Sequence, residues 1–444
     1  MTHTRKDGGN PGRAARMLGV FTEVRGGEAG TVILLMLNLF ILLSAYYMLK
    51  TVREPLILMG GGAEVKSYTA AAQAVLLLFV VPLYSLFVTR MDRVRLINRV
   101  TAFFMSNLVL FYVLARLEVP YLGVAFFIWV GIFSLMIIAQ AWSFANDIYT
   151  SEQGKRLFPL VAVGSTSGAV FGSWMAGRLY DLEIGSFEIM LISATMLGGC
   201  LLITNLVSRR ERPALVRAAE TESSAPKGAG GARDGLRLVL RDRYLLLIGL
   251  LLLMANLVNT NGEFILGATI EGLARGAHGA GEAAERMIGG FYSGFFTWVN
   301  ALTALLQFFV VSRVMKYAGV AKALFVLPII ALGGYALMAS SAVLAVIRVA
   351  KICENATDYS LQNTVRQALF LPTSRDAKYQ GKQAVDTFFV RAGDVLSAGV
   401  VYVGGVLGFA TGHFALTNIA LIVVWIVVAA AIGRRHRALT EAAP

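Results

Sequence analysis

Ionisable and amide side chains recur at helical spacing within one otherwise apolar stretch, residues 343–370. At 100° per residue, these side chains fall within an arc of about 120° on a helix. They are Arg348, Lys351, Glu354, Asn355, Asp358, Gln362 and Arg366. We call these seven side chains the polar stripe. Inserting a charged side chain at membrane depth costs about 2.5–3.5 kcal/mol, so the polar stripe must face water or another polar helix. Its cations outnumber its acids and leave one positive charge for an anionic ligand. A charge ladder that only holds the helix in place is the structural alternative.

A second candidate anion site lies near the end of the first apolar run. Tyr46, Lys50 and Arg53 fall within about 60° of one another on a helical wheel. Two cations on one face suit phosphate or carboxylate groups. Long basic side chains near a helix end also reach lipid headgroups, and this snorkelling is the alternative for Arg53 above all. Because Lys50 lies deeper in the run, we expect Lys50 to contact the ligand.

Further polar and aromatic residues extend the predicted site. Asn259 places an amide in the seventh apolar run, where it binds ligand or ties helices together. Trp142 could stack on a flat ring, although an interfacial tryptophan is an equal alternative. Buried carboxylates can load and release a proton, and a cation nearby adjusts that equilibrium. The residues that we expect to act in coupling or gating are Glu354, Asp358, Asp386 and Arg391.

Other kinds of chemistry find little support in the sequence. Cys200 and Cys353 both lie in apolar stretches, and the four histidines are not closely spaced, so we expect no metal centre. Neither a nucleophile–base pair nor a cofactor-binding loop is visible, and we therefore expect neither an enzyme nor a bound cofactor. Gly164, Gly168 and Gly172 recur every four residues, which is typical of close helix contact rather than of phosphate binding.

The elements that carry these residues are predicted to be membrane helices. The chain has 444 residues, of which 57% are hydrophobic and only 15% charged, against about 25% charged in soluble domains. The apolar runs lie near 31–52, 68–89, 98–117, 121–145, 159–178, 188–208, 244–262, 287–312, 323–341, 343–370, 384–410 and 414–433. Lipid offers no partner for backbone groups, so each run must be a helix. The sequence predicts an all-α membrane protein with twelve transmembrane helices.

The basic residues predict how these helices are oriented. Most of the 40 Lys and Arg residues fall in segments on one side, which places both ends in the cytoplasm. The net charge of +13 therefore reflects topology, and we expect no nucleic-acid partner. With no cleavable signal or transit peptide visible, we expect a multi-pass protein of the bacterial inner membrane. The predicted organisation is a cytoplasmic segment (1–30), a six-helix bundle (31–208), a flexible cytoplasmic linker (209–243), a second six-helix bundle (244–433) and a cytoplasmic tail (434–444).

The two predicted bundles share short sequence matches. Gln153-Gly154-Lys155 and Gln380-Gly381-Lys382 occupy equivalent loops, and Glu54-Pro55-Leu56-Ile57-Leu58 corresponds to Glu263-Phe264-Ile265-Leu266. Matches in register with a six-helix offset indicate a parallel repeat about an axis along the membrane normal. This favours a major-facilitator-like architecture, in which the cavity lies between the two bundles.

Several segments resemble the ATP/ADP translocases of plastids and obligate intracellular bacteria. They are Tyr47-Met48-Leu49-Lys50-Thr51-Val52-Arg53-Glu54, Trp142-Ser143-Phe144-Ala145-Asn146, Lys155-Arg156-Leu157-Phe158-Pro159-Leu160, Asp358-Tyr359-Ser360-Leu361 and Gly381-Lys382-Gln383-Ala384-Val385-Asp386. The resemblance implies a twelve-helix transporter that exchanges nucleotides, and Lys382 and Asp386 match the lysine and acid of a family motif. The family's acids in helices four and seven are absent here, where Asn256-Leu257-Val258-Asn259 ends in an amide.

Together these observations predict a secondary transporter of anionic solutes, most simply a nucleotide exchanger that works by alternating access. The cations expected to neutralise phosphate are Lys50, Arg53, Arg348, Lys351 and Lys382, and Tyr46 or Trp142 would stack on the base. The expected partners are a nucleotide or other anionic small molecule and the lipid bilayer, with the protein as a monomer. Two alternatives stay open: a proton-coupled transporter of another small solute, and a transport-inactive membrane scaffold or sensor.

Overall fold

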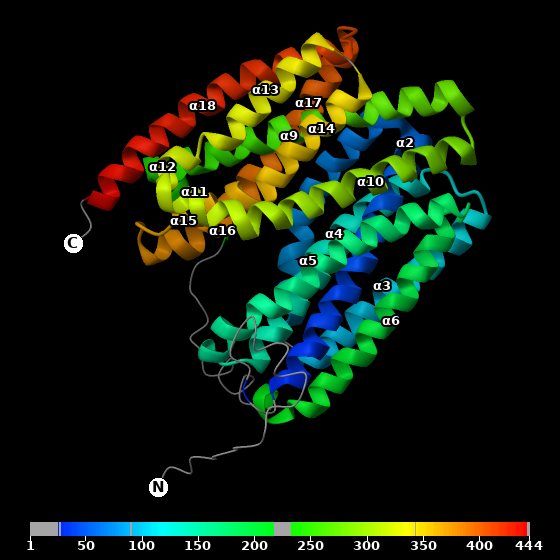
Figure 1. Cartoon of the computed structure of the whole chain (residues 1–444), viewed down its shortest axis with the longest axis vertical. Helices are drawn as coiled ribbons and strands as arrows, with labels where there is room; N and C mark the ends of the chain where they lie inside the picture. Colours follow the sequence, from blue (N-terminus) through cyan, green and yellow to red (C-terminus); the bar gives the residue numbers. More distant parts are fainter. Residues whose placement is uncertain (1–24, 26–27, 89–90, 217–231, 342, 442–444) are drawn as a thin grey trace.

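The computed structural model describes residues 25, 28–88, 91–216, 232–341 and 343–441, and its regular elements over these residues are all helices. Most of the predicted segment 1–30 and parts of the predicted linker (209–243) and tail (434–444) lie outside the described residues. The first bundle comprises α2 (Glu28–Val88), α3 (Arg93–Arg116), α4 (Leu122–Ile148), α5 (Ser151–Asp181) and α6 (Ser186–Arg210), as Figure 1 shows.

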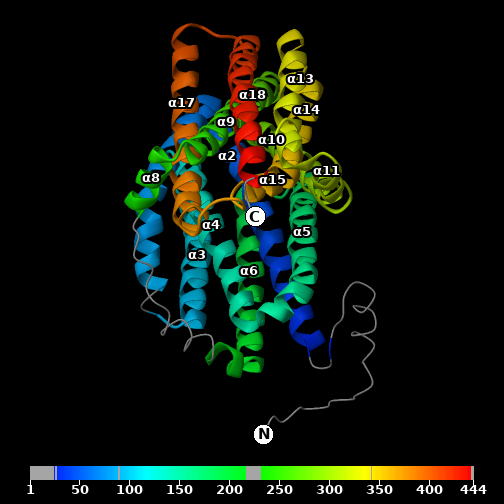
Figure 2. The same cartoon turned by 90° about the vertical axis from the view of Figure 1, so that its left-hand side faces the viewer.

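α2 is a helical hairpin rather than one long helix (Figure 2). The chain reverses at Gly62, whose φ of 82° lies in the left-handed region that glycine adopts without strain. Across this reversal, Lys66 forms an ion pair with Glu54 at 2.5 Å. The two predicted runs 31–52 and 68–89 therefore correspond to the two arms of α2, joined by a tight turn.

The second bundle contains several helices that pass through π turns. It comprises α9 (Arg243–His278), α10 (Glu282–Leu305) with η1 (Leu306–Val311) and α11 (Ser312–Tyr317), α12 (Gly319–Ala323), α13 (Val326–Ser340), α14 (Leu344–Thr357) with η2 (Asp358–Gln362) and α15 (Asn363–Leu369), η3 (Ala377–Gly381), α16 (Lys382–Ala384), η4 (Val385–Phe389), α17 (Val390–Val406) and α18 (Thr411–Glu441). Such π turns often mark functional positions in helices.

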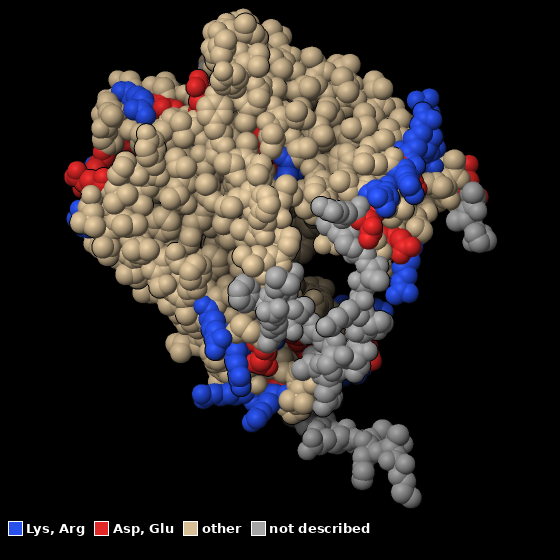
Figure 3. Space-filling view, turned by 180° about the vertical axis from the view of Figure 1, so that it is seen from behind, with Lys and Arg blue, Asp and Glu red and all other residues tan. Residues whose placement is uncertain are grey.

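Ten of the described helices are long and apolar enough to cross a membrane. The first of them contains both arms of α2, and the helical segment 344–369 carries too many charges to be counted among the ten. With these two corrections, the described chain supplies twelve segments of spanning length. Figure 3 shows the corresponding surface, a broad band with very few charged side chains between two charged ends.

Each bundle has its own hydrophobic core. One core is built entirely from the first bundle, with Phe104, Phe133 and Leu197 among its buried residues. The other core is built mainly from the second bundle, and Ile57 and Leu58 at the end of the first arm of α2 join it. The bundles therefore have separate cores, which meet at Ile57 and Leu58 near Gly62.

The close approach of α5 to α2 depends on small residues. A Cβ at Gly164, Gly168 or Gly172 would overlap backbone atoms of the first arm of α2. The carbonyl groups concerned belong to Met36, Phe40 and Ser44. This contact confirms that the four-residue glycine spacing serves helix packing.

The two bundles are joined at one end and diverge at the other, as Figure 1 shows. We call the end near Gly62 the closed end. There Arg275 donates to the carbonyls of Leu58 and Met59 at 3.2 Å each, and Glu271 accepts from the Ala63 N–H at 2.8 Å. Within the described chain, every hydrogen bond between the bundles lies between this end and the middle of the molecule. The opposite, open end shows a hollow beside the grey residues in Figure 3.

Helix starts at the open end carry side-chain caps. Asp92 accepts from the Arg95 N–H, and Thr150 and Gln153 form a capping box at the start of α5. One part of the predicted flexible linker is also ordered, because residues Ala232–Arg241 form the helix α8. Its Gly235 lies against the backbone of Gln380, so the prediction of a flexible linker is wrong for this part.

Candidate functional site

Lys50 lies between the two bundles, on the first arm of α2. Its Nζ is 4.5 Å from the ring centre of Phe296 on α10 and 5.8 Å from that of Tyr359 in η2. The ring of Tyr47, one turn earlier, lies 5.2 Å from the same nitrogen. Lys50 forms no ion pair with any described residue, so its charge is balanced only by aromatic faces.

The side chains around Lys50 are only partly buried. Tyr359 is 39% exposed although it lies in the middle of the helical segment 344–369. Tyr46 is half-buried and stands 5.1 Å from the Tyr47 ring in an edge-on arrangement. A half-buried cation, one exposed tyrosine ring and two half-buried ones between the bundles are features of a binding site for an anion with a flat ring.

Arg53 is held by neighbouring groups. Its guanidinium lies 2.6 Å from Glu54, and its central carbon is 4.3 Å above the Phe127 ring. Glu54 is buried and also pairs with Lys66. Arg53 is therefore part of a structural ion cluster, and the snorkelling alternative does not describe it.

Lys351 is fully buried in a polar network of the second bundle. Its Nζ lies 2.9 Å from Glu354 and 3.9 Å from Glu263, and it donates to the side-chain oxygen of Asn259 at 2.8 Å. Tyr335 donates to Glu354 at 3.1 Å. Lys351 thus has two carboxylate partners, and it is not the uncompensated cation that the helical stripe predicts.

Glu263 also belongs to this network, although it lies outside the polar stripe of residues 348–366. It comes from α9, accepts from the Asn355 side chain at 3.0 Å and is the repeat counterpart of Glu54. Each of the two repeat acids lies beside a buried lysine, Lys66 in one bundle and Lys351 in the other. The sequence signal for Glu263 was therefore the internal repeat.

The family comparison agrees with this architecture. The sequence profile described as "TLC ATP/ADP transporter" matches residues 124–436. The chain belongs to this family. It is 22% identical over 350 residues to ADP,ATP carrier protein 1 of Chlamydia trachomatis, covering 70% of this chain and 64% of that protein. The corresponding protein of Chlamydia muridarum is 21% identical over the same shares. The chain thus spans less than two thirds of the length of these relatives, 64%.

Solved structures show the same fold at low identity. A single-residue mutant of the nucleoside transporter NupG matches with a TM-score of 0.65 and 12% identity, over 90% of this chain and 99% of that one. A single-residue mutant of the peptide transporter POT, in complex with alafosfalin, matches with a TM-score of 0.63 and 11% identity, over 95% and 99%. These likenesses confirm the major-facilitator-like pair of helix bundles that the internal repeat predicts.

In this TLC-family chain, three predicted coupling or gating residues remain besides Glu354, which pairs with Lys351. Asp358 is the first residue of the π turn η2, next to Tyr359. Asp386 lies 3.9 Å from Arg366 and connects η4 to α15. Arg391 lies 3.5 Å from Asp394.

Asp394 also ties two helices of the second bundle together. It accepts from Asn256 at 2.7 Å and from Thr260 at 3.2 Å, both on α9. The pair of Arg391 and Asp394 therefore belongs to the contact between α17 and α9.

Three predicted ligand residues are not near Lys50. Arg348 lies in an apolar groove between α10 and α14, so the expectation that the stripe faces one common surface is wrong there. Trp142 packs edge-on against Phe158, 6.2 Å between ring centres, in a pocket with Lys155. Lys382 lies on α16, one turn before Asp386. These positions depend on helix rotation and tilt, which spacing along one helix does not define.

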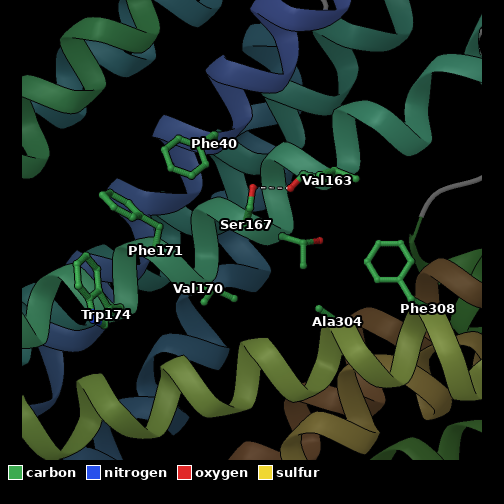
Figure 4. A pocket seen from close by; sticks show the side chains of 9 residues that line it. Phe40, Val163, Ser167, Val170, Phe171, Trp174, Ala304 and Phe308 are labelled. Carbon is green, nitrogen blue, oxygen red and sulfur yellow. Dashed lines mark hydrogen bonds between the residues drawn. The ribbon is translucent and has the colours of Figure 1, made fainter. Parts of the chain in front are cut away.

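A lateral groove separates the bundles beside the site (Figure 4). It has a volume of about 580 Å³ and is lined by α2 and α5 on one side and α10 and η1 on the other. The lining residues include Phe40, Phe171, Trp174, Ala304 and Phe308. Its apolar lining suits contact with lipid, while Ser293 of α10 donates to the Ser173 carbonyl of α5 at 2.7 Å and joins the two helices.

Proposed function

We propose that this chain is a secondary transporter that exchanges nucleotides of the ATP/ADP type across a membrane by alternating access. Membership of the TLC ATP/ADP transporter family and the names of the chlamydial relatives support the substrate class. The observation that carries the proposal is Lys50, a cation without a carboxylate partner among the described residues, placed between the bundles.

The proposed binding mode follows from the chemistry around Lys50. A nucleotide phosphate would replace the weak aromatic contacts of Lys50 with a charge-assisted hydrogen bond. The exposed ring of Tyr359 and the ring of Tyr46 offer surfaces for the base. Lys382 would meet the substrate at the open end, whereas Arg53 and Lys351 support the site through their ion pairs.

Exchange follows if the empty carrier reorients slowly. Closing the open end around an unpaired Lys50 would bury an uncompensated charge, which is unfavourable. A bound phosphate removes this penalty and allows the two bundles to rock. The hydrogen bonds of Arg275 and Glu271 at the closed end must then break.

The proposed membrane placement uses the same geometry. We assign the open end to the cytoplasm of a bacterial inner membrane, because the Lys and Arg residues gather on its rims (Figure 3). The bundles 31–208 and 244–433 are the proposed rocking units. We further propose a monomer that has no enzymatic activity and binds no nucleic acid.

The test is uptake of labelled ATP into proteoliposomes that are preloaded with ADP or left empty. We expect preloading to stimulate uptake. Lys50→Gln should lower exchange about tenfold or more, since a hydrogen bond to a charged group contributes about 1.5–3 kcal/mol. Lys50→Arg should retain part of the activity.

Lys316→Gln is the matched control. Lys316 is also a lysine above a tyrosine ring, at 5.4 Å from Tyr317, but it lies on the exposed surface. We expect this variant to exchange at the wild-type rate. Equal uptake into preloaded and empty vesicles would exclude exchange.

Proton-coupled transport of another solute is the second candidate function. Two carboxylates, Glu263 and Glu354, share Lys351, and Asp358 forms no ion pair with a described residue. Such carboxylates could bind the coupling proton. Uptake driven by an imposed pH gradient, and lost in Asp358→Asn, would favour this function over exchange.

A transport-inactive scaffold or sensor is the remaining alternative. Saturating nucleotide stabilises a binding protein by about 2.7 kcal/mol at one hundred times its Kd. No thermal stabilisation by any nucleotide or other organic anion would favour the scaffold.

A further inference from the structure

Arg348 lies on a different surface from the other charges of its helix. Its guanidinium carbon is 5.2 Å from the ring centre of Phe291 on α10, and it forms no ion pair with any described residue. The groove around it has a volume of about 650 Å³ and runs between α10 and α14. A Cβ on Gly294 would lie 2.5 Å from the guanidinium, so Arg348 rests directly on α10.

The groove opens on the outer, apolar surface of the second bundle. Trp298 and Val349, which line it, are 63% and 60% exposed. From Phe291 to Leu305 the groove follows α10 for about 21 Å at 1.5 Å per residue. One leaflet of the hydrocarbon core is about 15 Å thick, so an acyl chain fits along this length.

Arg348 lies near the start of α14, toward the closed end of the molecule. It follows the first residue of α14, Leu344, by four residues, which is about 6 Å from the closed end of that helix. A guanidinium binds phosphate through paired hydrogen bonds, and aromatic contact alone leaves its charge unbalanced. A single uncompensated cation favours a headgroup with net negative charge.

We propose that this groove is a binding site for an anionic phospholipid of the leaflet at the closed end. The phosphate binds Arg348, and one acyl chain lies along Trp298 and Leu305. Because the lipid touches both α10 and α14, its binding ties together two helices of the second bundle. The site is independent of the substrate between the bundles.

Fluorescence quenching of Trp298 tests this proposal in proteoliposomes of phosphatidylcholine. Brominated phosphatidylglycerol or brominated phosphatidylcholine is added at equal mole fraction, and the signal of Trp298→Phe is subtracted to isolate Trp298. We expect about fivefold preference for the anionic lipid, the effect of one cation near a lipid surface. Arg348→Gln should abolish this preference.

Two further variants test whether the preference depends on the position of the guanidinium and on this arginine in particular. Gly294→Ala retains the charge but displaces the guanidinium, and it should reduce the preference. Arg313→Gln removes an exposed arginine of α11 near the open end and should leave it unchanged. Equal quenching by both lipids, or a preference that survives in Arg348→Gln, would overturn the proposal. The latter result would indicate general enrichment of anionic lipid around a basic protein.

Discussion

At the scale of single residues, each bundle buries a lysine beside a repeat-related acid. Glu54 pairs with Lys66 at 2.5 Å, and Glu263 lies 3.9 Å from Lys351, which also pairs with Glu354. Buried charges of this kind contribute little net stability as a group, but the loss of one partner leaves the others uncompensated. The lysines therefore serve mainly to neutralise the acids that line the inner surfaces of the bundles.

Lys351→Met tests this role. We expect the free energy of unfolding to fall by about 3–5 kcal/mol, because Glu263 and Glu354 lose their cation in a buried site. The double variant Lys351→Met/Glu354→Gln should recover part of that loss, since it removes the uncompensated charge of Glu354 and leaves only that of Glu263. Unfolding in detergent micelles measures both variants, with the exposed Lys316→Met as control. A double variant less stable than the single one would contradict this account.

At the scale of elements, the contact between α2 and α5 depends on glycines, which have no side chain. Gly164, Gly168 and Gly172 let α5 approach the backbone of the first arm of α2. Without a hydrophobic driving force in lipid, close packing of this kind holds helices together. The contact makes α2 and α5 move as one body, and both helices also border the lateral groove.

Gly168→Ala should therefore lower the free energy of unfolding by about 1–3 kcal/mol, the usual effect of overpacking. Its Cβ would overlap the carbonyl group of Phe40. Gly199→Ala on α6 is the matched control, because a Cβ there meets nothing within 4 Å. Since alanine favours helix over glycine, we expect this control to be neutral or more stable. Equal effects of the two substitutions would show that the close approach is not needed.

At the scale of the whole molecule, a small set of contacts keeps the closed end shut. Arg275 lies 2.9 Å from Glu271 on α9, and together they bind backbone groups of Leu58, Met59 and Ala63 around the reversal of α2. These bonds reach from one bundle to the other. In a rocking mechanism, they stabilise the conformation that is open at the opposite end.

Arg275→Gln should shift the population toward a conformation in which the closed end opens. Spin labels at Tyr121 in the first bundle and Ala277 in the second, both exposed, report the separation of the bundles there. We expect a second, longer distance to gain population in the variant. Arg286→Gln is the control, because the partner of Arg286 is Glu282 in the same bundle. An unchanged distance distribution in Arg275→Gln would show that the hydrogen bonds of Arg275 are not needed to keep this end closed.

The sequence alone determined the membrane fold and the pairing of the two bundles. Long apolar runs can satisfy their backbone groups only as helices, and matched segments six helices apart predict related bundles. The same logic identified the glycine stripe as a packing surface and singled out Lys50 as the deeper cation of its helix. These features depend on composition and on spacing along one element.

Tertiary structure alone decided which charges meet. Glu263 pairs with Lys351 from another helix, Arg53 pairs with Glu54, and Arg348 lines an apolar groove between α10 and α14. The wheel of a single helix gives the angle between its own side chains, but it contains no information on the neighbour that each side chain faces. That choice is made by the rotation and tilt of whole helices, which follow from packing over both bundles.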